Sequence, residues 1–381
     1  MSDTQSQAGK IRLAFLVRSL DFGGAQRQLV TLAKALDKNQ FEVSILTFYS
    51  GQPLEQELEN TSVRLVSLNK SGRWDLLPFL GRLIRETRAL RPDILHGYLD
   101  IPNVLALFLK GFVRARIVWG VRASAMELRR YDWLFRLAAR VEQWLSRFPD
   151  LIIVNSVAAR DYHVANGFPA HKLKLIPNGI DTQVFKPDTQ ARRKMRNDWG
   201  ISETTRLIGT VGRLDPVKDL PDFLQAAALI NRELTETRFI CVGTGPAHYV
   251  EHLKYLAHDL GIAESVIWEP ARQDIAAAYN ALDLLVSSSQ AESFPNSVAE
   301  AMSCGVPCIV TDVGDSALLV GDNGTVVPPR NPQALATAII SSLEANRIER
   351  RLQTRNRIVA NFSVEQLVFT TQETLISLCR N

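Results

Sequence analysis

Short apolar runs alternate with amphipathic stretches along the first half of the chain. Residues 25–36 repeat apolar side chains at helical spacing, whereas residues 41–48 alternate as a strand does. This alternation of strands and helices predicts a parallel sheet with helices on both faces. The strands predicted in this half span residues 11–17, 41–48, 63–68, 94–95, 116–119 and 151–154.

The same pattern begins again in the second half. Turn residues lie between the halves, in Pro177-Asn178-Gly179 and in Lys186-Pro187-Asp188. We therefore predict an α/β protein of two domains, residues 1–185 and 186–361, followed by a last helix at 362–381. The strands predicted in the second half span residues 207–211, 239–242, 266–268, 284–287 and 308–311.

Length and composition fit this two-domain prediction. A chain of 381 residues with 46% hydrophobic residues is typical of a globular protein. No apolar run approaches the ~20 residues that span a bilayer, and the first ten residues are polar rather than a secretory signal. The four cysteines form no Cys-x-x-Cys pair, and no histidine near Cys304 and Cys308 completes a zinc site. We expect reduced thiols, no metal and a cytoplasmic protein.

Charge is divided unevenly between the halves. The net charge is +4, but residues 1–185 carry 25 Lys/Arg and 17 Asp/Glu, and the rest of the chain is acidic. A basic half beside an acidic half suggests that one of them meets an anionic surface or ligand. Nucleic acid is not expected as that partner, because no helix-turn-helix, zinc or RNA-binding signature is present.

The most informative segment is Glu292-Ser-Phe-Pro-Asn-Ser-Val-Ala-Glu300, between a predicted strand and a predicted helix. Ligands of open α/β sheets bind at the carboxyl ends of strands, and the unpaired N–H groups of a helix start favour phosphate. Pro295 suits the first turn, and with Asn296 as the cap the next two amides would be free. Glu300, one turn into the helix, could accept hydrogen bonds from vicinal hydroxyls. A phosphate beside a diol describes a nucleotide sugar.

This segment resembles the Glu-x7-Glu signature of the retaining glycosyltransferases of family 4. That family has the GT-B fold, in which two Rossmann-like domains face each other, the donor lies in the interdomain cleft and the last helix crosses back to the first domain. The resemblance extends from Gly23 to the last helix. It implies that Glu292 faces the donor sugar and Glu300 holds the ribose, with further donor contacts from Phe294, Pro295, Asn296 and Ser297. Two solvated glutamates at a loop-to-helix junction are the alternative.

A basic motif, Gly212-Arg213-Leu-Asp-Pro-Val-Lys218-Asp219, follows the first strand of the second half. Arg213 offers a planar fork for phosphate oxygens, and Lys218 offers a point charge. Such cations stabilise the charge that grows on a leaving diphosphate without a metal. The motif resembles the family's Gly-Arg-(x)n-Lys pattern, whereas a solvated basic turn is the alternative.

Two glycine loops and one arginine complete the donor-side candidates. Asp21-Phe-Gly-Gly24 follows the first strand, where paired glycines let the backbone approach a diphosphate. By resemblance Gly24 would contact the diphosphate, Gly243 would lie near the nucleotide and Arg272 would contact the base. Gly24 and Gly243 could instead serve only tight turns, and Arg272 could be a surface arginine.

One position departs from the family's pattern. Arg122, in Gly120-Val-Arg-Ala-Ser124, stands where many members carry a histidine near the reaction centre. An arginine stays charged, so Arg122 cannot shuttle a proton but could neutralise the diphosphate or an acidic acceptor. His96, at the end of the fourth strand, is the other catalytic candidate, or else a structural histidine.

Residues 126–148 predict a long helix with a basic stripe bordered by Trp133 and Trp144. Such a stripe suits an anionic membrane surface, and a core-packed helix with a solvated basic face is the alternative. Membrane binding would favour a lipid-linked acceptor and a peripheral position on the inner face of the membrane. The stripe consists of Arg129, Arg136, Arg140 and Arg147.

The combined prediction is a metal-independent, retaining hexosyltransferase. It would use a nucleoside-diphosphate sugar, UDP favoured over GDP, and a lipid-linked glycan acceptor in polysaccharide or glycolipid assembly. A soluble acceptor, or a nucleotide-sugar-binding partner subunit with impaired catalysis, are the alternatives. No cofactor is expected. A dehydrogenase is disfavoured because no Gly-x-Gly-x-x-Gly follows the first strand.

Overall fold

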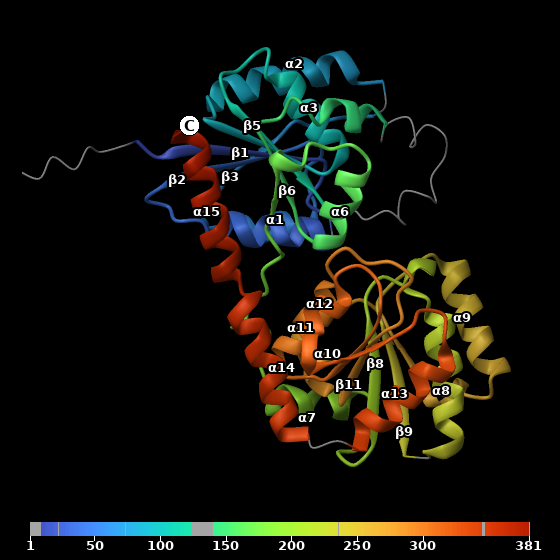
Figure 1. Cartoon of the computed structure of the whole chain (residues 1–381). Helices are drawn as coiled ribbons and strands as arrows, with labels where there is room; N and C mark the ends of the chain where they lie inside the picture. Colours follow the sequence, from blue (N-terminus) through green and yellow to red (C-terminus); the bar gives the residue numbers. More distant parts are fainter. Residues whose placement is uncertain are drawn as a thin grey trace, which may run out of the picture. The chain divides into compact units, whose positions relative to one another are not determined.

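The computed structural model describes residues 9–21, 23–72, 74–122, 140–234, 236–344 and 347–380. The chain forms two compact units: the first runs to Gly179 and resumes at Val364, and the second is Ile180–Ser363. Each unit is built on one parallel sheet, which confirms the predicted fold class of two Rossmann-like α/β domains (Figure 1). The second unit begins before the predicted residue 186 because Ile180 already bridges to Ser363.

The sheet of the first unit has the strand order β3-β2-β1-β4-β5-β6-β7, all parallel. β1 lies between β2 and β4, and Leu13 on it lies opposite both Val43 and Ile94. The predicted strands match six of the seven, and β7 has too few residues to produce an apolar pattern. The strands are β1 (Ile11–Val17), β2 (Phe41–Thr47), β3 (Arg64–Ser67), β4 (Ile94–Tyr98), β5 (Arg116–Val121), β6 (Leu151–Val154) and β7 (Leu173–Leu175).

Helices cover both faces of this sheet (Figure 1). α2 and α3 pack on one face through Phe79 and Leu109, whereas α1 and α15 pack on the other through Leu29 and Leu367. The last helix of the chain, α15, therefore contributes to the core of the first unit. The helices are α1 (Gly24–Ala35), α2 (Leu76–Leu90), α3 (Asp100–Leu109), α6 (Val157–Ala165) and α15 (Val364–Arg380), with short 3-10 turns η1 (Pro53–Leu58) and η2 (Ala170–Lys172).

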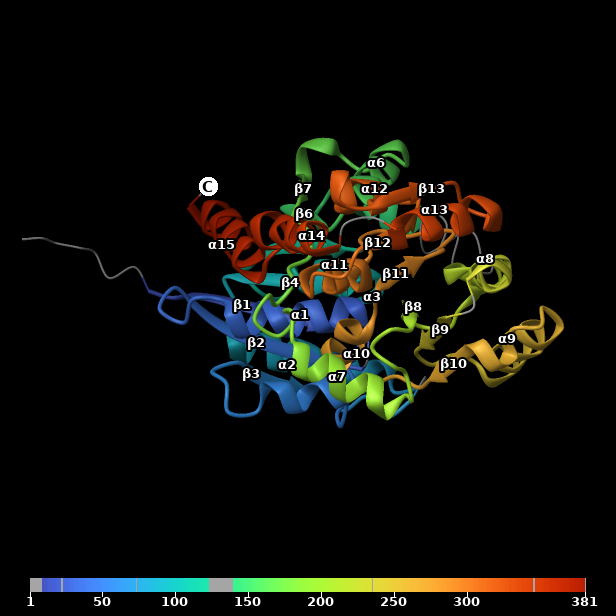
Figure 2. The same cartoon turned by 90° about the horizontal axis from the view of Figure 1, so that it is seen from below.

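The second unit has the strand order β10-β9-β8-β11-β12-β13, also parallel (Figure 2). The chain moves from β8 to one side of the sheet and returns to the other side at β11. All its strands were predicted except β13, which again has only three residues. They are β8 (Arg206–Val211), β9 (Thr237–Val242), β10 (Val266–Glu269), β11 (Leu284–Ser287), β12 (Cys308–Thr311) and β13 (Thr325–Val327).

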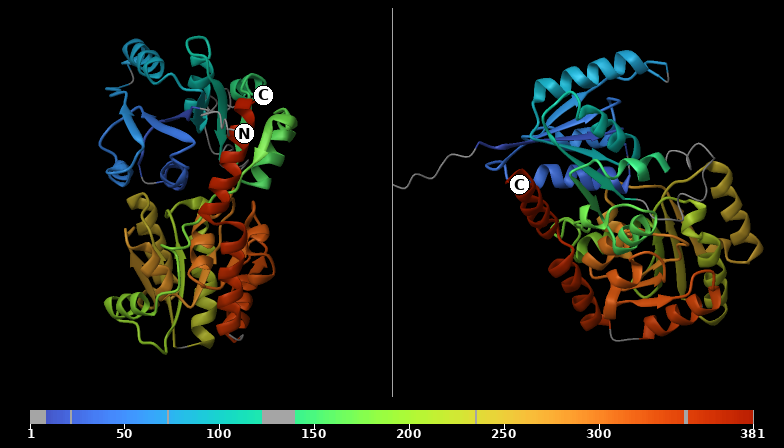
Figure 3. Two further views of the ribbon diagram at one scale, coloured as in Figure 1. Left: turned by 90° about the vertical axis from the view of Figure 1, so that its left-hand side faces the viewer. Right: turned by 45° about the horizontal axis from the view of Figure 1, so that its top comes forward.

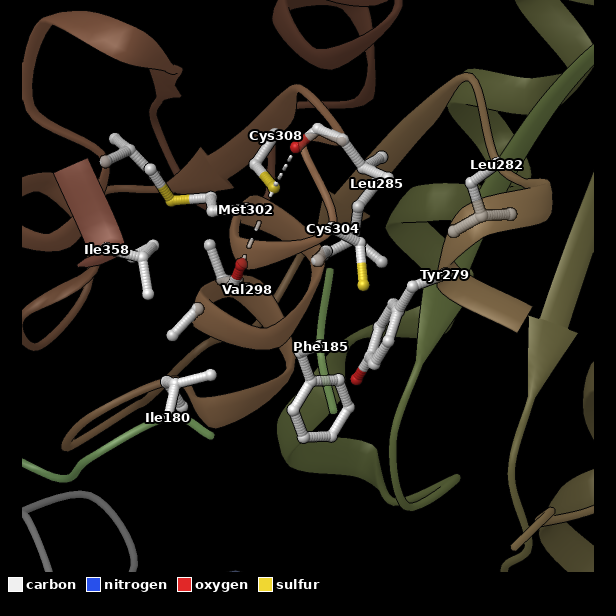
Figure 4. Close-up of a cluster of buried hydrophobic side chains, with 14 of the residues drawn as sticks. Ile180, Phe185, Tyr279, Leu282, Leu285, Val298, Met302, Cys304, Cys308 and Ile358 are labelled. Carbon is white, nitrogen blue, oxygen red and sulfur yellow. Dashed lines mark hydrogen bonds between the residues drawn. The ribbon is translucent and has the colours of Figure 1, made fainter. Parts of the chain in front are cut away.

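Two groups of helices bury the faces of the second sheet. α8, α9 and α13 pack on one face through Phe223, Leu253 and Leu335. α10, α11 and α14 pack on the other, where Tyr279 and Phe185 meet edge to face (Figure 4). The helical elements are α7 (Thr189–Asp198), α8 (Leu220–Glu233), α9 (Ala247–Asp259), α10 (Ile275–Ala281), α11 (Asn296–Ser303), α12 (Ser316–Val320), α13 (Pro332–Glu344) and α14 (Arg347–Asn361), with η3 (Pro216–Lys218), η4 (Ala263–Ser265) and η5 (Gly321–Asn323).

The cysteines are free thiols, and three of them are buried. Cys304 and Cys308 lie in the core around α11 (Figure 4), Cys241 lies on β9, and Cys379 near the end of α15 is exposed. Burial raises the pKa of the Cys304 thiol to about 12. The two thiols in Figure 4 therefore act as small apolar side chains.

The predicted arginine helix at 126–148 lies largely outside the described residues, including Arg129, Trp133 and Arg136. Its described end is helical at 140–145, and Arg140 and Trp144 are exposed there. Among the helices that the structure describes, none combines the length and apolar character that a membrane crossing requires.

Candidate functional site

The candidate site of the second unit lies where β8 and β11 end. These strands are neighbours, and the order of the chain through the sheet changes direction between them. Ligands of open α/β sheets bind at the carboxyl ends of strands at such a point. Residues that follow the two strands line one small pocket there, among them Gly212, Arg213, Lys218, Ser288 and Ser297.

Lys218 and Glu292 form an ion pair in this site. Lys218 Nζ lies 2.6 Å from Glu292 Oε1, and the hydroxyl of Ser289 donates to the same oxygen at 2.7 Å. The carboxylate is only 10% exposed and the lysine side chain 26%, so both charges are largely withdrawn from water. Charge-assisted hydrogen bonds of this kind are the strong ones. The structure thus brings the basic motif and the Glu-x7-Glu segment into contact, although Lys218 and Glu292 lie 74 residues apart in the sequence.

Close backbone contacts fix the loops that carry this pair. Gly243 has φ +152°, and a Cβ atom there would lie 1.8 Å from the carbonyl oxygen of Gly212. Gly314 has φ +54°, and a Cβ atom there would lie 1.9 Å from the carbonyl oxygen of Glu292. Only glycine fits at either position. Gly243 therefore has a structural role, and its predicted nucleotide contact stays a prediction.

Arg213 stands at the exposed rim of the site. Its side chain is 66% exposed, and its Nε lies 3.6 Å from a carboxylate oxygen of Asp215. Asp215 accepts the amide of Val217 at 2.9 Å and so caps η3, which ends at Lys218. The guanidinium is held loosely and can turn toward an incoming phosphate.

Helix α11 begins at Asn296, and its cap is Pro295. The prediction that Asn296 caps the helix with two free amides is therefore wrong. The amide of Val298 donates to the carbonyl of Pro295 at 3.1 Å, because the first turn closes one residue earlier than expected. The amide of Ser297 belongs to the first turn, where N–H groups have no acceptor within the helix, and Ser297 lines the pocket.

Glu300 is buried on α11, one turn beyond the pocket. The hydroxyl of Tyr279 on α10 donates to Glu300 Oε2 at 2.7 Å. Tyr279 also belongs to the apolar core beneath the site, as Figure 4 shows. The second glutamate of the signature is thus fixed by a buried hydrogen bond.

In the first unit, Arg122 follows β5 and lies over an aromatic ring. Its guanidinium carbon is 4.4 Å from the centroid of Tyr98, and its Nη1 donates to Asn178 Oδ1 at 2.6 Å. Burial lowers the pKa of the guanidinium, but an arginine remains charged at neutral pH. The position therefore supplies a fixed, partly desolvated cation.

His96 on β4 lies beside Tyr98 and beneath Gly120. Its ring is buried, and within the described part of the chain neither ring nitrogen has a hydrogen-bonding partner. Burial, together with the nearby Arg122 charge, lowers the pKa of His96 to about 3. The ring is therefore neutral at physiological pH, which suits packing rather than proton shuttling.

The comparisons with known proteins agree with this arrangement. Residues 22–184 match the family described as Glycosyltransferase Family 4, and residues 205–345 match that described as Glycosyl transferases group 1. A D-inositol 3-phosphate glycosyltransferase of Corynebacterium jeikeium is 32% identical over 354 residues, which cover 84% of this chain and 83% of that protein. The chain belongs to glycosyltransferase family 4.

Further matches agree with this glycosyltransferase assignment and with the fold. The putative glycosyltransferase EpsF of Bacillus subtilis is 24% identical over 314 residues, 79% of each chain. The crystal structure of HepE from Anabaena in complex with UDP and glucose has a TM-score of 0.85 and 23% identity, covering 96% of this chain and all of that one. The fold of the glycosyltransferase is therefore GT-B.

The structure shows the local environment of three residues that were predicted to contact the donor of this glycosyltransferase. The side chain of Phe294 is buried against Phe362, with ring centroids 5.6 Å apart, so only its backbone could reach a ligand. Arg272 is held by Glu269 and Asp274, whose hydrogen bonds raise its pKa. Gly24 is the exposed first residue of α1. Their roles toward the donor stay predictions.

Sequence reasoning missed three residues that support the glycosyltransferase site. Tyr279 binds Glu300, Ser289 binds Glu292, and Gly314 leaves room for the backbone of Glu292. Ser289 follows β11 within a run of three serines, which was the one available signal. Tyr279 lies on a helix outside any motif, so the sequence carried no signal for it.

Proposed function

We propose that this glycosyltransferase transfers a hexose with retention of configuration from a nucleoside-diphosphate sugar, UDP preferred, without a metal. The observation that carries the proposal is the Lys218–Glu292 ion pair at the change of direction between β8 and β11. A single lysine placed there can bind a diphosphate while it orients the carboxylate that meets the sugar. The UDP bound in the Anabaena relative supports the choice of nucleotide.

Each residue of the site has a role in this reaction. The leaving diphosphate receives the electron pair of the broken C1–O bond, and Lys218, Arg213 and the first turn of α11 stabilise its charge. The acceptor hydroxyl forms the new bond on the same face of C1 and gives its proton to the diphosphate oxygen. Glu292 binds sugar hydroxyls, and Glu300, oriented by Tyr279, binds the ribose.

The surroundings of the two glutamates disfavour a glycoside hydrolase. Hydrolases need one carboxyl as a general acid and another as base or nucleophile across the scissile bond. Glu292 is paired with a lysine, and Glu300 is buried and accepts a hydrogen bond from a tyrosine. Both are therefore suited to accept hydrogen bonds from hydroxyl groups.

Two classes of acceptor are compatible with the proposed reaction. A lipid-linked glycan suits the basic composition of the first half of the chain, with a position on the inner face of the membrane. A soluble phosphorylated acceptor is the second candidate, favoured by the D-inositol 3-phosphate glycosyltransferases among the relatives. In either case Arg122 would bind an anionic group of the acceptor or the leaving diphosphate.

The first experiment is thermal stabilisation by UDP-, GDP- and ADP-sugars, with and without EDTA. Binding to the native state raises the melting temperature at saturating ligand. We expect a shift with UDP-sugars that EDTA does not remove. The anomeric configuration of the product, read by NMR, then tests retention. Binding without turnover of any acceptor would instead indicate a catalytically impaired partner subunit, and no shift with any donor would contradict the proposal.

A further inference from the structure

Cationic side chains gather at the edge of the first unit where its parallel strands begin. This edge is opposite to the strand ends that carry Arg122, and the left panel of Figure 3 looks toward it. Among the described residues, the acidic side chains that line the two hollows described below are Asp93 and Asp150, and Glu42 and Asp37 lie near Arg12 and Lys10. We call this surface the basic edge; its cations are Lys10, Arg12, Arg88, Arg91, Lys110, Arg114, Arg116, Arg147 and Lys172.

Two adjoining hollows form the centre of the basic edge. The larger, about 780 Å³, is lined by Lys10, Lys110 and Arg116, and the smaller, about 450 Å³, by Arg88 and Arg91. Arg12 and Arg114 line both hollows, which makes the basic lining continuous.

The two carboxylates that line the hollows are already paired. Arg12 binds Asp93 with Nη2 to Oδ1 at 2.6 Å, and Lys110 and Arg116 flank Asp150 at 3.5 and 3.7 Å. Within the described residues Arg91 and Arg114 have no ion-pair partner. The surface therefore keeps an excess of positive charge that its own acidic groups do not neutralise.

Exposed aromatic rings stand among these cations. Phe108, Phe112, Trp144 and Phe148 are between 37% and 57% exposed. The ring of Phe108 contacts that of Phe112 at 5.1 Å, and the ring of Trp144 contacts that of Phe148 at 5.5 Å. Lys110 joins the two pairs, because it lies between the first two in sequence and its Nζ donates to the carbonyl of Phe148 at 3.2 Å.

Helix ends explain only part of this surface. α2 and α3 end at this edge, where cations are favourable beside the negative ends of the helix dipoles. That effect gives no reason to expose four aromatic rings. Rings that border cations are typical of proteins that lie on an anionic membrane, where the rings enter the interface and the cations bind lipid phosphates.

The ring geometry favours a membrane over single-stranded nucleic acid. The rings within each pair are tilted by 49° and 65°. They form two compact apolar tips rather than a row of open faces on which successive bases could stack. We propose that the basic edge docks the enzyme on an anionic lipid surface, with lipid phosphates entering the hollows. The inference deepens the proposed function, since it rests on a lipid-linked acceptor.

The test is cosedimentation of the full chain with vesicles of phosphatidylcholine, with and without 30% phosphatidylglycerol. We expect binding only to the anionic vesicles, weakened by salt because exposed charges are screened. The double variant R91E/R114E should lower the partition coefficient at least tenfold, since each cation near such a surface contributes roughly fivefold. The variant W144S/F148S should lower it as well, by loss of the apolar tips.

Matched controls separate this site from a general effect of charge. R232E/K254E makes the same change in net charge at exposed cations of the second unit, and Phe369→Ser removes another exposed ring. Both controls should bind as the unmodified protein does. Equal losses in the controls, equal binding to neutral vesicles, or binding to RNA in place of vesicles would each overturn the proposal.

The docking test is independent of the transferase activity. Melting-temperature shifts with UDP-sugars should be the same in R91E/R114E and in the unmodified protein, and they also show that the variant is folded. A donor shift without vesicle binding would refute docking alone. Vesicle binding without any donor shift would leave docking intact and refute the transferase proposal.

Discussion

The two signature glutamates of the second unit and His96 of the first unit are largely buried functional groups held by opposite means. In the second unit the charges are paired: Glu292 with Lys218, and Glu300 with the hydroxyl of Tyr279. In the first unit His96 is buried in contact with aromatic rings, without a hydrogen-bonding partner among the described residues. Pairing fixes the orientation of a polar or charged group, whereas desolvation without a partner favours the neutral form of a histidine.

Because of this difference, a different kind of experiment is informative for each unit. Removing a partner in the second unit leaves a buried charge unpaired, which is costly. Among the described residues of the first unit His96 has no such partner, so a change of pH is the more direct perturbation. The second unit is therefore tested by substitutions that break its pairs. The first unit is tested by a substitution that keeps the charge but changes its geometry, and by a change of pH.

The largest effect is expected for Lys218→Ala. This change removes the cation that we propose binds the diphosphate, and it leaves the carboxylate of Glu292 largely buried without its partner. Truncating one member of a buried charge pair costs roughly 2–5 kcal/mol, so the donor Kd should rise at least about thirtyfold. Calorimetric titration with a UDP-sugar measures it.

The control for this change is Lys218→Arg, which keeps the charge near Glu292. It should retain more donor affinity than the alanine variant. Unchanged donor affinity in Lys218→Ala would show that the ion pair is only structural, and the comparison between the units would lose its basis.

The next effect is expected for Arg122→Lys. A lysine cannot lie flat over Tyr98 and donate a fork of N–H groups at the same time. Transfer should fall about tenfold to a hundredfold, less than for complete loss of one oriented donor in an active site because the lysine keeps the charge, while donor affinity stays the same. Steady-state transfer rates and thermal shifts measure the two quantities separately.

The exposed Arg64 of the same unit offers a control, since Arg64→Lys should change neither quantity. A loss of donor affinity in Arg122→Lys as large as the loss of rate would assign Arg122 to donor binding instead.

The sequence predicted the fold more fully than it predicted the contacts. Apolar runs bounded by turn residues located β6, β11 and β12 to the residue. β4 was predicted to be only two residues long, because the apolar run stops at Leu95 and His96, Gly97 and Tyr98 do not continue it. β7 and β13 have three residues each, which is too few for any periodicity.

The sequence motifs predicted the location of the site, because the motif residues follow the ends of strands. Strand topology brings Lys218 and Glu292 to neighbouring strand ends, so their common location was predictable. Their direct ion pair was not, because it depends on side-chain rotamers. Helix propensity also could not distinguish Pro295 from Asn296 as the cap of α11.

A smaller effect is expected from the pH dependence of stability. The pKa of His96 is about 3 in the folded protein and about 6.5 in the unfolded chain. As pH falls, the unfolded chain takes up the proton before the folded protein does. The contribution of the neutral His96 ring to the free energy of unfolding is therefore fully present above pH 6.5 and is lost as the pH falls from 6.5 to 3. Between pH 7 and pH 5 the unmodified protein should lose about 2 kcal/mol more unfolding free energy than His96→Gln does.

Chemical denaturation at the two pH values measures this difference. His258→Gln, which removes an exposed histidine, provides the control substitution. Equal losses in the unmodified protein and in His96→Gln would mean that His96 is not held neutral by burial. A direct NMR titration of the ring settles the same point if the glutamine variant does not fold.

The smallest effect is expected for Tyr279→Phe, which removes only the hydroxyl that binds Glu300. The ring stays in the core beside Phe185, so packing is preserved. A hydrogen bond to a charged group contributes about 1.5–3 kcal/mol, but Glu300 can regain part of this from a ribose once the donor binds. We therefore expect a modest loss of stability without donor and a donor Kd raised about threefold to tenfold. Tyr255→Phe, at an exposed position, should change neither quantity. If the stability falls but the donor Kd is unchanged, Tyr279 supports the core alone, and Glu300 needs no orientation to act on the donor.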